Sequence, residues 1–223
     1  MGIEQLRLDY KKSTGHEPNV VLSDELSAEC PAGVWPNCEI RIWSGLTDEN
    51  KTEAEAHELY HIMLRCEGLV AFKVNVSTGS IRFCSDDVIY LENVARELNN
   101  AISHWYLITQ LHEKYQIESK LQKILREPPI DELLNDISGV IEHKPLLHHY
   151  GLMAYDISRT NLNSRSYVDK IIGSHDEIGK AYNASIMYLD QIKIYQPIKV
   201  QQHHCKCLFD QLGYQDCFDI WDK

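Results

Sequence analysis

The amino-acid sequence predicts an α+β fold, in which a few short strands and one well-marked helix precede a helical C-terminal half. Three observations carry this prediction. Ile40 and Ile42 alternate with charged residues in CEIRIW (38–43), which is typical of a half-buried strand. Apolar residues at helical spacing follow over 52–66. Beyond residue 116, helical segments are separated by prolines and a glycine.

The remaining elements follow in chain order. A short helix is expected over residues 1–15, ending at Gly15, and a first strand over 19–26. A hairpin is expected from 69–76 and 81–84, with Gly79 in its turn, and then a long helix over about 87–115. Later helices are expected to break at Pro128-Pro129, near Pro145, at Gly173 and at Pro197. We therefore predict a domain over 1–116 and a helical region over 117–223 packed on it.

Composition excludes several classes of function. The 223 residues carry a net charge of −11 and no cluster of lysine and arginine, which argues against binding nucleic acid. No apolar run is long enough to cross a bilayer, and the polar start MGIEQLRLDYKK is not a signal peptide. We expect a cytoplasmic protein without a membrane partner, whose seven cysteines are reduced thiols.

The helix over 52–66 contains the motif HELYH, in which His57, Glu58 and His61 have the spacing His-Glu-x-x-His. Thr52 and Glu55 have the spacing of a capping box at its start, and Gly68 is a natural stop. Histidines four residues apart on a helix point to the same side, so both rings can reach one metal ion. The glutamate between them can act as the general base on a metal-bound water. The motif predicts a catalytic Zn²⁺ site.

Three residues of the later long helix compete for the place of third ligand: Glu92, Glu97 and His104. Glu97 shares a helix face with Asn100 and His104, and a buried polar stripe of this kind is costly unless its members bind one another or a metal. We favour Glu97, with Asn100 or His104 orienting the ligands by hydrogen bonds. Glu92 and His104 remain the alternative ligands.

The segments CEIRIWSGLTDENKTEAEAHELYHIMLRCEG (38–68) and ARELNNA (95–101) resemble the ImmA/IrrE group of metallopeptidases. The resemblance implies a zincin-like small mixed sheet, a ligand set of His57, His61 and Glu97 with Glu58 as base, and a protein or peptide substrate. A metzincin is excluded, because Leu64 and Glu67 replace the glycine and third histidine of that pattern. Tyr60 and Leu98 depart from the resembled motifs.

Other segments also contain residues that could take part in catalysis or bind a metal. His149 or Tyr150 in HKPLLHHY (143–150) can serve as an oxyanion stabiliser. HHCKC (203–207) is too tightly spaced for the common zinc patterns, and we interpret it as a helix end. The C-terminal helices are expected either to restrict substrate entry or to bind a partner protein. The alternative to a peptidase is a non-catalytic interaction or regulatory protein that retains a zincin-like fold.

Overall fold

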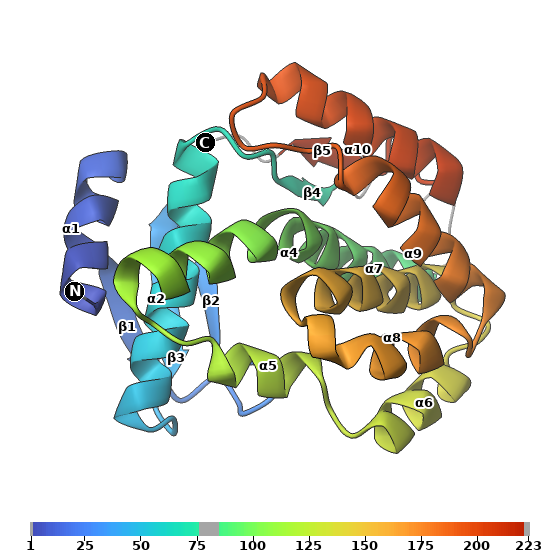
Figure 1. Ribbon diagram of the computed structural model, residues 1–223, viewed down its shortest axis with the longest axis horizontal. Helices are drawn as coiled ribbons and strands as arrows, with labels where there is room; N and C mark the ends of the chain where they lie inside the picture. Colours follow the sequence, from blue (N-terminus) through green and yellow to red (C-terminus); the bar gives the residue numbers. More distant parts are fainter. Residues whose placement is uncertain (1, 76–84, 221–223) are drawn as a thin grey trace. The chain divides into compact units, whose positions relative to one another are not determined.

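The computed structural model describes residues 2–75 and 85–220 (Figure 1). The protein is a mixed α+β structure, 65% helical, with small sheets and a helical C-terminal half, which confirms the predicted fold class at this level. Its contacts divide the chain into two compact units: Met1–Glu67 with Tyr106–Arg126, and Gly68–Trp105 with Glu127–Lys223. One long helix contributes a segment to each unit. The predicted domain over 1–116 and helical region over 117–223 stay predictions.

A three-stranded sheet lies in the first unit. Its strands are β1 (Asn19–Ser23), β2 (Ala32–Trp35) and β3 (Glu39–Trp43). β3 occupies the middle, parallel to β1 and antiparallel to β2. Ile40 and Ile42 are buried, whereas Glu39 and Arg41 are partly exposed and form an ion pair at 2.7 Å. The predicted alternation of this strand is confirmed, and a short 3₁₀ turn (Pro36–Cys38) joins it to β2.

Two helices of the first unit pack against each other. α1 (Ile3–Thr14) ends, as predicted, at Gly15, whose φ of 80° is a conformation that glycine adopts without strain. α2 (Asp48–Cys66) contains the HELYH motif and packs on β3. Arg7 of α1 donates to both carboxylate oxygens of Glu55 at 2.6 and 2.7 Å, so a bidentate ion pair links the two helices.

The predicted capping box at Thr52 and Glu55 is wrong. α2 begins one turn earlier, where the Thr47 side chain accepts a hydrogen bond from the Asn50 amide. Thr52 therefore lies inside the helix and donates to the Asp48 carbonyl, while Glu55 faces Arg7. The helix begins after Thr47 because the Thr47 side chain satisfies an amide of the first turn. Glu55 is then able to pair with Arg7 of α1.

A second buried acid of α2 fixes the short helix α5 (Lys120–Arg126), which also belongs to the first unit. The Glu53 carboxylate accepts the backbone amides of Leu121 and Gln122 at 2.9 and 3.0 Å. These amides lie in the first turn of α5 and have no partner within the helix, so the acid completes its N-terminus. Burial raises the pKa of Glu53, and the amide bonds act against that shift.

The second unit contains a two-stranded antiparallel sheet of β4 (Phe72–Val74) and β5 (Phe218–Ile220). The predicted hairpin placed β4 beside residues 81–84, but that arm and its turn lie outside the described residues. The described partner of β4 comes instead from the other end of the chain. The Asn99 side chain bonds both the amide and the carbonyl of Phe72 at 2.9 Å, and so joins β4 to the long helix.

Helices dominate the rest of the chain (Figure 1). They are α4 (Ser85–Tyr115), α6 (Ile130–Gly139), α7 (Lys144–Thr160), α8 (Arg165–Ile172), α9 (Asp176–Leu189) and α10 (Ile198–Leu212), with a 3₁₀ turn (Leu162–Ser164) before α8. The predicted breaks are confirmed. α6 and α10 begin directly after prolines, Pro145 lies in the first turn of α7, and Gly173 follows α8.

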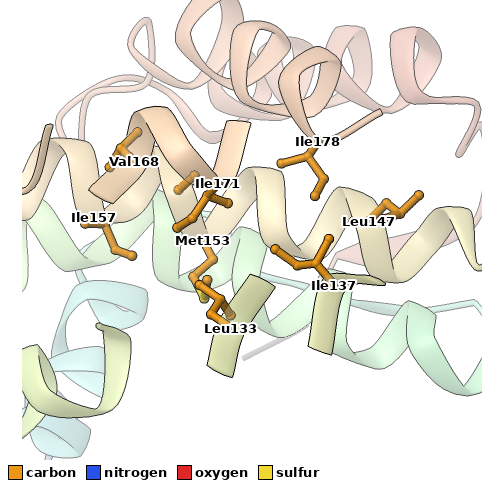
Figure 2. Close-up of a cluster of buried hydrophobic side chains, with 9 residues drawn as sticks. Leu133, Ile137, Leu147, Met153, Ile157, Val168, Ile171 and Ile178 are labelled. Atoms are coloured by element: carbon orange, nitrogen blue, oxygen red, sulfur yellow. The ribbon is translucent and has the colours of Figure 1, made fainter. Parts of the chain in front are cut away.

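Figure 2 shows the hydrophobic cluster that joins α6, α7, α8 and α9. Its buried members are Leu133, Ile137, Leu147, Met153, Ala154, Ile157, Val168, Ile171 and Ile178. α7 and α9 approach closely at Gly151, where an added Cβ would meet the Ala181 Cβ at 2.6 Å and the Ile178 carbonyl at 2.7 Å. Over residues 2–75 and 85–220, no helix is both long and apolar enough to cross a membrane.

Candidate metal centre

His57 and His61 lie one turn apart on α2, and their rings meet edge to face with centroids 4.6 Å apart. Their Nε2 atoms are 3.0 Å apart, so both rings direct the same nitrogen toward one place. Two nitrogens on a tetrahedral zinc, each about 2.05 Å from the metal, are about 3.3 Å apart. His57 is buried and His61 partly exposed, which leaves the pair both ordered and accessible. The geometry of the pair fits a shared metal ion.

The sequence neighbours of the two histidines on α2 are buried, namely Leu59, Tyr60 and Ile62. They anchor the motif segment of α2 in the first unit. Tyr60 departs from the resembled motif, and its ring packs edge to face with Tyr115 at a centroid distance of 6.1 Å. The tyrosine therefore has a packing role in the first unit.

Glu58 is partly buried, and this burial raises the pKa of its carboxyl to about 7, although the positive charge of Arg65 acts to lower it. Burial disfavours the charged carboxylate because the interior solvates it poorly. Glu58 follows His57 directly on α2, so the only acid between the two histidines lies beside one of them.

His104 lies on α4 and bonds Asp156 of α7 within the second unit. Its Nδ1 is 2.7 Å from the Asp156 Oδ2, and the two side chains are 3% and 2% exposed. We assign the Nδ1 proton to the histidine, since a carboxylate only accepts.

His57 and His61 belong to the first unit, whereas His104 belongs to the second. The pair on α2 is therefore the part of the candidate site that one unit contains. Imidazole nitrogens are donors that suit zinc.

Glu97, the favoured third ligand, is 1% exposed on α4 and accepts a hydrogen bond from the Asn100 side-chain amide at 2.9 Å, so part of the predicted polar stripe is satisfied internally. Glu92 is exposed on the same helix. The ligand roles of Glu97, Glu92 and His104 stay predictions.

The two candidates for oxyanion stabilisation lie on α7. The Nδ1 of His149 is 3.4 Å from the Asn93 carbonyl, and its ring contacts that of Tyr150. Tyr150 packs against the hydrophobic cluster of the second unit, and burial raises the pKa of its hydroxyl. Their oxyanion role stays a prediction.

HHCKC lies within α10. Cys205 is fully buried, which raises the pKa of its thiol, and the His203 Nε2 is 3.9 Å from the Cys207 sulfur. No group of three metal-ligating side chains includes these residues in the described parts of the chain.

Sequence reasoning missed Asp156, the residue that bonds the candidate ligand His104. The available signal is an acidic residue inside the apolar run GLMAYDI (151–157), at a position that helical periodicity places among buried neighbours. A buried acid in such a run needs a partner. The sequence does not say which one, because the partner lies 52 residues away.

Comparison with protein-family models, with curated proteins and with solved structures found no match to this chain.

Proposed function

We propose that the protein is a zinc-dependent metallopeptidase, in which His57 and His61 hold the metal with a third ligand from Glu97, Glu92 or His104, and Glu58 is the general base. The observation that carries the proposal is the histidine pair, whose Nε2 atoms lie 3.0 Å apart. Three protein ligands would leave the fourth position of a tetrahedral zinc for water, as catalytic sites require. Glu58 adjoins one ligand on the same helix turn.

The residues have distinct roles in this proposal. When bound, zinc would supply Lewis-acid chemistry for the peptide carbonyl and would lower the pKa of a bound water to about 7. Glu58 would accept the proton of the attacking water and later pass it to the leaving amine.

The substrate class rests on the sequence resemblance rather than on the pair of His57 and His61. HELYH and RELNNA resemble the motifs of ImmA/IrrE peptidases, which supports a peptide bond in a protein or peptide as the target. A zincin-like architecture, a cytoplasmic location and a partner-binding or access-restricting role for the C-terminal helices belong to the same proposal.

The test combines metal content with hydrolysis of an unfolded protein such as casein. Native protein should contain one zinc per chain and cleave the substrate. E58Q should keep the zinc and lose activity by at least about 100-fold, the scale of one general base. Loss of zinc from E97Q, E92Q or H104A would identify the third ligand, with E97Q the expected variant; zinc retained by all three would contradict a third ligand from this helix.

Two results would contradict the proposal. Native protein without zinc would exclude the metal centre. Zinc-containing protein in which E58Q is as active as the wild type would exclude the base, and zinc retention without hydrolysis of any tested peptide would favour the interaction protein that retains the site.

A further inference from the structure

We propose that His203 and Cys207 form half of a zinc site on the outer face of α10, and that a second copy of the chain supplies the other half. Two histidines and two cysteines would then hold one zinc ion between the copies. The site lies within the second unit of each copy and shares no residue with the metal centre proposed above. It gives the chain a further property, zinc-dependent self-association.

The helix places the residues of HHCKC on two faces. Cys205 is fully buried on the inner face of α10, together with Leu208 and Leu212. His203 is exposed and Cys207 is partly exposed. Because these two residues lie four positions apart, their side chains point to the same side of the helix, away from its buried face.

The geometry of the pair suits a shared metal. The His203 Nε2 is 3.9 Å from the Cys207 Sγ. On a tetrahedral zinc with bonds of about 2.05 Å to nitrogen and about 2.3 Å to sulfur, the two ligand atoms are about 3.6 Å apart. A small movement of either side chain brings the pair to that distance. The thiol releases its proton to solvent when the sulfur binds the metal.

One chain does not complete the site, because structural zinc takes four protein ligands. Over residues 2–75 and 85–220, neither His203 nor Cys207 belongs to a group of three metal-ligating side chains. Identical chains most often associate about a two-fold axis, and an axis through the metal doubles every ligand. Two copies therefore provide two cysteines and two histidines, a common ligand set of structural zinc.

The surface around the pair suits a second copy of the chain. Val200 lies three and seven residues before the two ligands on the same helix face and is 39% exposed. Ile198, at the start of α10, is 41% exposed. The helix carries two lysines and one aspartate, whereas the whole chain has a net charge of −11. Two copies can therefore meet at α10 with apolar contact and with less repulsion than the net charge implies.

Sedimentation of the full chain with and without zinc tests the proposal. A phosphine reductant excludes dimers that are held by a disulfide. Zinc is added beyond one equivalent, because the metal centre proposed above needs no second chain and would fill first. The wild type should double its mass with zinc, bind one further ion for each pair of chains, and return to its zinc-free mass when EDTA is added.

Variants identify the ligands. C207S and H203Q should keep the zinc-free mass. Two matched controls should associate as the wild type does: H204Q changes the neighbouring histidine, and C30S removes an exposed cysteine of the first unit. H61Q should also associate, so failure of the proposed metallopeptidase site would leave this inference standing.

Cobalt in place of zinc reports the sulfur ligands directly. The wild-type dimer should show the charge-transfer absorption of cobalt bound to thiolates, and C207S should lose it. A wild type whose mass does not depend on zinc, or a C207S that associates equally well, would overturn the proposal. Equal losses in H204Q and H203Q would overturn the assigned ligand pair. Cobalt bound through Cys207 without a change in mass would overturn the role of the second copy.

Discussion

His148 is a buried histidine whose protonation state affects the stability of the second unit. It is 0% exposed, and burial lowers its pKa to about 4, although Glu177 acts in the opposite direction and Lys144 and Lys180 add to the lowering. The unfolded chain binds a proton at this residue near pH 6.5, and the folded chain does so only near pH 4. Stability is therefore complete above pH 6.5 and falls as the pH decreases toward 4.

We expect the wild type to lose about 2 kcal/mol at this residue between pH 7 and pH 5, in addition to the loss from all other groups. H148Q can still bond Tyr214 and Glu177 but has no proton to gain. Urea unfolding of both proteins across this range gives the difference. Equal losses in wild type and H148Q would show that the histidine is not held neutral.

At the scale of single elements, the sequence offers two threonines that could cap the start of α2: Thr47 and Thr52. The Thr47 side chain caps the helix, whereas Thr52 bonds a carbonyl inside it. We expect T47A to lower the free energy of unfolding by about 1 kcal/mol and T52A to change it by less than about 0.5 kcal/mol. Guanidinium unfolding measures both. A larger effect of T52A would restore the capping box that the sequence suggests.

The contact between α7 and α9 depends on the absence of a side chain at Gly151. A methyl group there would clash with Ala181 and with the Ile178 carbonyl, so G151A should cost about 1–3 kcal/mol despite the better helix propensity of alanine. Gly139 on α6 has no atom within 4 Å of an added Cβ, and G139A should be neutral or stabilising. Thermal unfolding compares the two variants. A harmless G151A would mean that the helices are not in close contact.

At the scale of the whole molecule, the sequence is most informative where the information is local. His57, Glu58 and His61 could be predicted as a group because helical periodicity alone brings them to one side of α2. The helix breaks at prolines and glycines could be predicted for the same reason, since each depends on the backbone of one or two residues.

What could not be predicted depends on contacts distant in sequence. The pairing of His104 with Asp156 spans 52 residues, and the pairing of β4 with β5 joins two ends of the second unit. α4 carries an uninterrupted helical pattern, which gives no sign that Tyr106–Tyr115 packs in one unit and the preceding segment in the other. Tertiary packing, rather than local preference, decides each of these.

The most direct test of the metal centre is X-ray absorption at the zinc edge of the purified, zinc-loaded full chain. The account predicts one zinc per chain with nitrogen and oxygen neighbours at about 2.0–2.1 Å and the scattering pattern of imidazole rings. Protein that takes up no stoichiometric zinc, or a zinc bound by fewer than two imidazoles, would contradict the proposal that His57 and His61 are its ligands.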